Sequence, residues 1–234
     1  MTSSQHIRSA FDRDLEMITS KMLKMGGLVE SSIIDAAEAF ESRDLELAQN
    51  VRKRDKKIDS LEAEINEDIT RIIALQAPAA SDLRTLLSIL KIAGNLERIG
   101  DYSKNMAKRT NVLSTLPVIE DSSSSLRRLV REVQNMLKDA LDAYTQRDSE
   151  LGIDIIARDR EVDELYNSLF REFLTYMMED PRSIPKIMDV LWSVRSLERI
   201  GDRCQNISEY VIYFVKGKDV RHTSEDDIEQ NILT

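Results

Sequence analysis

Four pairs of acidic residues stand at the spacing of one helical turn, in matching places of the two halves of the chain. The pairs are Asp55 with Asp59, Glu97 with Asp101, Asp159 with Asp163, and Glu198 with Asp202. Residues four apart on a helix share a face, with Cβ atoms about 5–6 Å apart, so each pair brings two like charges together. Hard divalent or trivalent cations take oxygen ligands readily. If the helices that carry the pairs are neighbours, the pattern favours two cation sites.

Ion pairing with Arg or Lys, or plain exposure to water, is the commoner reason for acids at this spacing. Arg98 and Arg199 directly follow the two glutamates. Residues one apart do not face each other on a helix, so these arginines are poor partners for the glutamates. In addition, Glu97 and Asp101 continue the line of apolar residues that starts at Leu83 on one face of the helix. This position and the repetition therefore favour metal ligands.

The elements that must position these acids are long amphipathic helices. Apolar residues recur at steps of three and four, which predicts helices over 11–40 and 47–75, a third starting near 83, and three more over 122–146, 149–178 and 183–216. Pro78 ends the second helix, and Ser81 is expected to cap the third. Only 7 Gly and 4 Pro are present, too few turn residues for a sandwich or barrel. The fold class is all-α.

The two halves of the chain repeat each other. The hexapeptide Leu-Glu-Arg-Ile-Gly-Asp occurs at 96–101 and again, letter for letter, at 197–202. Asp35, Arg43-Asp44 and Arg54 also match residues 104 positions later. A duplicated three-helix unit is the natural interpretation, with short connections making neighbours antiparallel. We expect a first unit over 1–114, a second over 122–217 and a flexible tail over 218–234.

Composition excludes several classes of function. The net charge of −9 argues against nucleic acid as the main partner, because phosphate binding needs a clustered cationic surface. One cysteine forms no internal disulfide and fits a reducing compartment. No apolar run approaches the roughly 20 residues of a membrane span. We therefore expect a soluble, cytoplasmic protein.

The chain also lacks recognisable catalytic motifs. It has no nucleophile elbow, Walker loop or dinucleotide fingerprint, so we expect no enzyme. Its two histidines, His6 and His222, fall outside the repeats. A ferritin-like di-iron site needs histidine three residues after glutamate and is therefore disfavoured. Cys204 and Trp192 are interpreted as packing residues.

The twin Leu-Glu-Arg-Ile-Gly-Asp motifs resemble those of the PhoU family, bacterial accessory and signalling proteins of phosphate transport. The segments 78–84, 206–209 and 217–222 agree with the same family, and the resemblance covers nearly the whole chain. It implies two pseudo-symmetric three-helix bundles. It also implies that the acidic motifs hold metal ions (Mn, Fe, Zn or Mg) at Asp55, Asp59, Glu97, Asp101, Asp159, Asp163, Glu198 and Asp202.

The resemblance further implies a function. Such a protein would be a negative regulator of the phosphate-starvation response and a modulator of phosphate uptake. Its partners would be the ATPase of the phosphate ABC transporter and a sensor histidine kinase, with the membrane reached only through them. A homodimer is expected.

Two alternatives stay open at this stage, one of which is a paralogue that serves a different phosphate carrier. A carboxylate metal-cluster protein could store metal or use it in an enzymatic reaction. The two halves also differ at one place near the acids, since Gly94 stands where the second half has Arg195. This difference could make the two metal sites unequal.

Overall fold

The computed structural model describes residues 2–113, 123–221 and 223, with side chains from 10 to 110 and from 124 onward. This part of the chain contains α-helices and one short 3-10 helix, η1 (Pro181–Ser183), but no strand. The all-α prediction is confirmed. The helices are α1 (Thr2–Ser42), α2 (Leu45–Gln76), α3 (Ala80–Leu113), α4 (Ser123–Gln146), α5 (Ser149–Glu179) and α6 (Ile184–Lys216).

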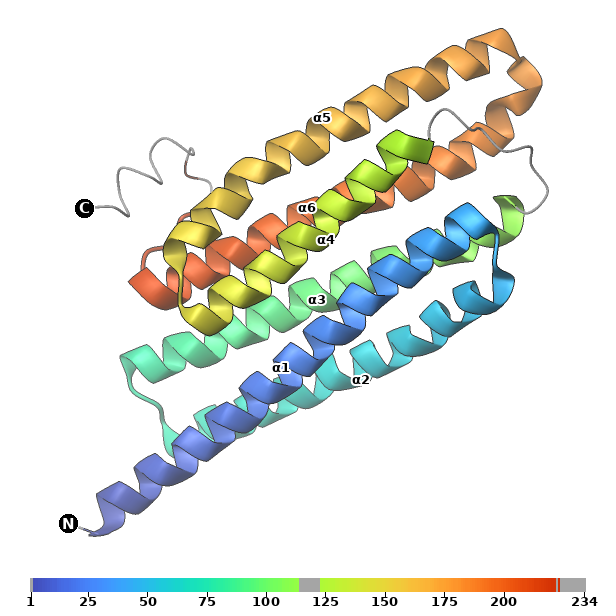
Figure 1. The fold of residues 1–234 in the computed structure, drawn as a ribbon. Helices are drawn as coiled ribbons and strands as arrows, with labels where there is room; N and C mark the ends of the chain where they lie inside the picture. Colours follow the sequence, from blue (N-terminus) through green and yellow to red (C-terminus); the bar gives the residue numbers. More distant parts are fainter. Residues whose placement is uncertain (1, 114–122, 222, 224–234) are drawn as a thin grey trace.

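The six helices form two three-helix groups that lie side by side (Figure 1). The first group is α1–α3 and the second is α4–α6, joined most extensively between α3 and α6 and also between α1 and α4. The outer helices, α2 and α5, pack on the other helices of their own group. The acidic pairs therefore lie on one outer helix and one central helix of each group.

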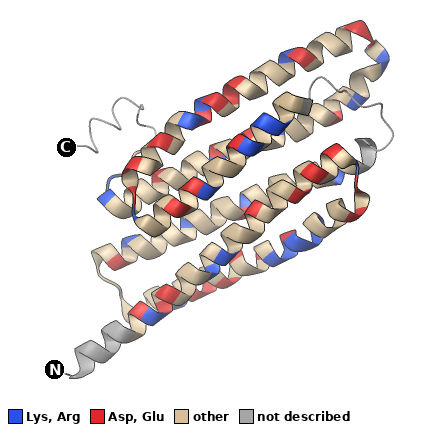
Figure 2. Ribbon diagram, viewed as in Figure 1, with Lys and Arg blue, Asp and Glu red and all other residues tan. Residues whose placement is uncertain are grey.

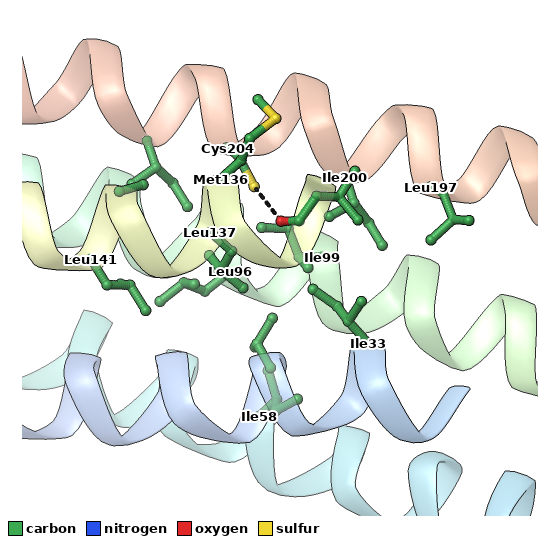
Figure 3. Close-up of a cluster of buried hydrophobic side chains, with 14 of the residues drawn as sticks. Ile33, Ile58, Leu96, Ile99, Met136, Leu137, Leu141, Leu197, Ile200 and Cys204 are labelled. Carbon is green, nitrogen blue, oxygen red and sulfur yellow. Dashed lines mark hydrogen bonds between the residues drawn. The ribbon is translucent and has the colours of Figure 1, made fainter. Parts of the chain in front are cut away.

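One apolar core runs through both groups. Ile33, Ile58 and Leu96 from the first group belong to the same buried cluster as Met136 and Ile200 from the second (Figure 3). Because the core is shared, the division into units over 1–114 and 122–217 stays a prediction. Most of the predicted tail over 218–234 lies outside the described residues.

Cys204 lies inside this core, as expected of a packing residue. Its thiol is fully buried and donates a hydrogen bond to the Val133 carbonyl at 3.9 Å (Figure 3). Burial raises the pKa of the Cys204 thiol far above its ordinary value. The thiol is therefore kept neutral and unreactive.

The repeated Arg-Asp dipeptides reverse the chain between helices. Arg43 and Arg147 adopt left-handed backbone angles, with φ of 61° and 54°. Asp44 and Asp148 then cap α2 and α5, each accepting hydrogen bonds from the backbone N–H groups two and three positions on, at 2.9 and 3.0 Å. The predicted Ser81 cap is wrong, because α3 already begins at Ala80.

The other charged residues that match between the two repeats form ion pairs between helices. Arg54 on α2 donates to Asp35 on α1 at 2.6 Å, and Arg158 on α5 donates to Asp139 on α4 at the same distance. Along the rest of the helices, basic and acidic residues are interleaved (Figure 2). The paired residues set the rotation of the outer helices, and with it the direction in which the acidic pairs point.

Candidate functional site

The glycine of each repeated hexapeptide lies where the outer helix crosses the central one. A Cβ on Gly201 would lie 2.8 Å from Asp159 Oδ1 and 3.0 Å from Val162 Cγ1. A Cβ on Gly100 would lie 3.2 Å from Ile58 Cδ1. No ordinary side chain fits at Gly201 without a shift of its neighbours. Glycine therefore allows the close helix approach that brings acids of two helices face to face.

The first cluster comprises Asp55 and Asp59 on α2 with Glu97 and Asp101 on α3. Asp55 is buried, only 5% exposed. Lys104 places its Nζ 2.6 Å from Asp55 Oδ2 and 2.5 Å from Asp101 Oδ1. A lysine ammonium therefore bridges the two helices at the centre of the cluster.

The environment keeps this ammonium charged. Burial lowers the pKa of Lys104, but the hydrogen bonds to Asp101 and Asp55 outweigh it and raise the pKa overall. Asp59 and Glu97, the two acids of this cluster that Lys104 does not contact, respond differently. Burial, followed by repulsion from Asp55 in one case and Asp101 in the other, raises the pKa of Asp59 and of Glu97. The first cluster is thus neutralised in part by its own lysine.

The second cluster comprises Asp159 and Asp163 on α5 with Glu198 and Asp202 on α6, and it lacks this lysine. The residue at the position that matches Lys104 is Gln205. Within the described side chains, neither Asp159 nor Asp163 lies within ion-pair distance of a cation. Burial, followed by Asp202, raises the pKa of Asp163, and the more distant charges of Arg195 and Arg199 offset only part of this rise.

Arg199 supplies the only nearby positive charge that forms ion pairs among the described residues of this cluster. Its Nη1 lies 2.7 Å from Asp202 Oδ2, and its Nε lies 3.4 Å from Glu198 Oε2. The expectation that this arginine is a poor partner was therefore wrong. It reaches the aspartate three residues on, as Arg98 does more loosely towards Asp101 at 3.7 Å.

Asp159 is the least compensated acid of the second cluster. Its Oδ1 is buried and accepts no hydrogen bond within the described structure. Burial is the main cause that raises the pKa of Asp159 to about 7, with further increases from Asp202, Asp163 and Glu198. Burial and Asp202 likewise raise the pKa of Glu198. A cation placed here would relieve both the desolvation and the mutual repulsion.

The predicted metal ligands are therefore brought together as two facing acidic pairs in each group. Among the described residues, however, no three acids already converge closely enough to share one ion. Unpartnered buried carboxylate oxygens, at Asp159 Oδ1 and Asp55 Oδ1, are the donors that hard cations prefer. The metal sites stay a prediction, and the donor chemistry of the second cluster fits it better.

Sequence reasoning missed Lys104. The signal was present, since Lys104 follows Asp101 by three residues and therefore shares its helix face. The search for repeated residues overlooked it, because the second half has Gln205 instead.

None of the described helices is apolar over a stretch long enough to span a bilayer.

The chain is similar to known proteins over most of its length. The model of the PhoU domain family matches residues 22–110 and 126–211, one match in each half. A phosphate-specific transport system accessory protein PhoU homolog of Pseudomonas putida is 45% identical over 219 residues, covering 94% of this chain and 86% of that one. The accessory protein PhoU of Escherichia coli K12 is 40% identical over 227 residues, covering 97% and 94%.

Solved structures agree with these sequence matches. The crystal structure of PhoU from Pseudomonas aeruginosa superposes with a TM-score of 0.86 at 43% identity, covering 89% of this chain and 100% of that one. The phosphate transport system regulatory protein PhoU from Streptococcus pneumoniae gives a TM-score of 0.82 at 30% identity, covering 90% and 99%.

Proposed function

The chain belongs to the PhoU family, and from this premise we propose that it regulates phosphate uptake and represses the phosphate-starvation response. The observation that carries the proposal is the full-length similarity to relatives whose names tie them to the phosphate-specific transport system. We propose two partners, the ATPase of the phosphate ABC transporter and a sensor histidine kinase. The protein would bind the transporter at the membrane surface and couple its state to the kinase.

A regulator of this kind acts without catalysis of its own. A binding protein shifts a two-state partner only when it binds the two states with different affinity. Here the bound form would favour the kinase state that keeps the starvation genes silent. Two similar helix groups, side by side, offer two similar faces for bridging two partners or for forming a homodimer.

Metal binding is part of the proposal. Asp159, Asp163, Glu198 and Asp202 would hold Mn, Fe, Zn or Mg more tightly than the first cluster, where Lys104 competes with a metal ion. When bound, the ion supplies positive charge that ties α5 to α6. It would thereby stiffen one helix group relative to the other.

A deletion strain tests the regulatory role. We expect high alkaline phosphatase activity in abundant phosphate, together with disturbed phosphate uptake, and return of both to normal when the gene is restored on a plasmid. A strain carrying an empty plasmid is the control. Normal repression and normal uptake in the deletion strain would exclude the proposed role.

The unpartnered carboxylates of the second cluster also support a second candidate, a protein that stores metal or uses it in catalysis. Purified protein loaded with Mn²⁺, Fe²⁺ or Zn²⁺ can be assayed for phosphatase and oxidase activity. Turnover that disappears with Glu198→Ala would favour this candidate. Absence of turnover alongside the deletion phenotype would favour the regulator.

A further inference from the structure

A pocket of about 740 Å³ opens between α3 and α6 beside the second acidic cluster. Cavities of this size are typical of small-molecule sites. Three guanidinium groups and two aromatic rings lie among its walls, which comprise Tyr102, Asn105, Arg109, Trp192, Arg195, Ser196 and Arg199. The wall chemistry is that of a site for an anion that also carries an apolar or aromatic part.

Two of these three arginines form no ion pair with a carboxylate in the part of the chain that the structure describes. Arg199 is engaged by Asp202 and Glu198. Arg109 instead donates to the Asn105 carbonyl at 3.0 Å, and Arg195 donates to the Tyr166 hydroxyl at 3.3 Å. Among the described residues, neither forms an ion pair within 4 Å. The Tyr166 hydroxyl, followed by the charge of Glu198, raises the pKa of Arg195, so acids act on this guanidinium only from beyond ion-pair distance. Two guanidinium groups without a direct carboxylate contact thus line the same small pocket.

Trp192 adds an exposed aromatic surface to these charges. It is the single tryptophan of the chain, and 53% of it is exposed, so its interpretation as a packing residue was wrong. The Arg109 guanidinium lies 5.9 Å from the centroid of its rings. A nucleobase stacks favourably on an aromatic side chain, because every base has a planar π face. The indole is therefore well suited to hold a planar ring next to bound phosphate.

The duplicated fold contains its own comparison. A second pocket, of about 570 Å³, lies between the same two helices and α2. By the 101-residue repeat, Lys91 and Gly94 stand there in the places of Trp192 and Arg195. That pocket is also lined by Glu62, an acid that would repel phosphate. The pairing of an indole with an unpaired arginine is consequently a property of one pocket and not of the fold.

We propose that the pocket lined by Trp192, Arg109 and Arg195 binds a nucleotide. The base stacks on the Trp192 indole, and the phosphate oxygens accept hydrogen bonds from the two guanidinium groups, which match phosphate geometry. Inorganic phosphate would leave the indole unused, and a neutral aromatic compound would leave both charges unpaired. The proposal rests on the pocket alone and does not depend on the regulatory role.

Fluorescence of the single tryptophan reports binding directly. ATP is titrated into the full chain in EDTA, with titration calorimetry in parallel, and tripolyphosphate and adenosine are the comparison ligands. We expect ATP to change the fluorescence with saturation, and to bind about tenfold or more tighter than either comparison ligand. Equal affinity for tripolyphosphate would overturn the stacking contact. Binding that needs added Mg²⁺ would assign the phosphate to the acidic cluster and overturn the guanidinium contacts.

Substitutions test the same assignment by calorimetry. Arg109→Ala and Arg195→Ala should each weaken ATP binding about tenfold, and Arg195→Lys should recover part of the loss. The matched control is Lys91→Ala, which removes a positive charge at the repeat position of Trp192 in the other pocket and should leave affinity unchanged. An equal loss in Lys91→Ala, or no loss in either arginine variant, would refute the proposal. Circular dichroism of each variant verifies the fold.

Discussion

Lys104 on α3 holds its ammonium 2.6 Å from the buried carboxylate of Asp55 on α2, and the matching residue in the second group is Gln205. This difference between the repeats therefore separates a cluster whose outer-helix aspartate has an ammonium partner from a cluster whose outer-helix aspartate, Asp159, has none among the described residues. The two sites were expected to differ because of Gly94 and Arg195. The Lys104 contact is a more direct cause of the difference between the two clusters, since Arg195 forms no ion pair with a carboxylate among the described residues.

Removal of the internal cation should destabilise the protein. Lys104→Gln leaves Asp55 buried without its partner, and we expect the free energy of unfolding in EDTA to fall by about 1–3 kcal/mol. Added Mn²⁺ should restore most of this loss, because the first cluster would then resemble the second. Urea denaturation measures both effects. Lys108→Gln, at an exposed lysine one turn further along α3, is the control and should change little.

The reciprocal change should have the opposite effect. Gln205→Lys places an ammonium where it can reach Asp159, which otherwise lacks a counter-charge. We expect higher stability than the parent protein in EDTA at neutral pH, and weaker stabilisation by Mn²⁺. Thermal unfolding with and without Mn²⁺ tests this. A variant that is less stable and still gains as much from Mn²⁺ as the parent would argue against the proposed equivalence of the two positions.

Much of the fold could be predicted from the sequence because its determinants are local. The spacing of apolar residues predicted the helices, whereas the capping of α2 and α5 by Asp44 and Asp148 was not predicted, although both aspartates belong to the repeat. The Ser81 cap failed because a good capping residue is only a preference, and α3 starts before it. Repetition identified the acids but concealed Lys104, whose role depends on a contact between helices that only one half makes.

Two further features needed coordinates. The function of Gly100 and Gly201 is set by how closely a second helix approaches, and the sequence does not give that distance. Trp192 was interpreted as a packing residue, but 53% of it is exposed. Its exposure depends on the end of the α3–α6 contact, where arginine side chains and open space replace apolar neighbours.

The pH dependence of stability should identify Asp159. Its folded pKa of about 7 is above the unfolded value near 4, so the folded protein binds the extra proton. The contribution to stability is complete below about pH 4 and is lost as the pH rises towards 7. In EDTA, Asp159→Asn should remove this contribution to the pH dependence of stability. At mildly alkaline pH the variant should unfold at a higher urea concentration than the parent protein.

Asp55→Asn is the matched control for that experiment, because it stands at the same place in the first group. There the substitution removes a partner of Lys104, so we expect lower stability at mildly alkaline pH. Stability changes of opposite sign in the two variants would support the account of unequal clusters. The same sign for both would show that the lysine does not distinguish them.

The two hexapeptide glycines should differ in tolerance. Gly201→Ala places a Cβ 2.8 Å from Asp159 Oδ1 and should cost about 1–3 kcal/mol of unfolding free energy. The Cβ of Gly100→Ala would lie 3.2 and 3.3 Å from Ile58 methyl groups and 3.9 Å, an ordinary contact distance, from Asp55 Oδ1. There the helix propensity of alanine, worth about 1 kcal/mol, offsets much of the strain. Differential scanning calorimetry ranks the two variants by stability. A larger loss of stability in Gly100→Ala than in Gly201→Ala would contradict this geometry.

The central claim is that the second acidic cluster requires a cation which the first already contains in Lys104. Calorimetric titration of metal-free protein with Mn²⁺ at neutral pH tests it most directly, in the parent chain and in two double variants. We predict that Glu198→Ala with Asp202→Ala abolishes the tightest binding, whereas Glu97→Ala with Asp101→Ala leaves it in place. Loss of the tightest binding only in the first-cluster variant, or no Mn²⁺ binding by the parent chain, would contradict the account.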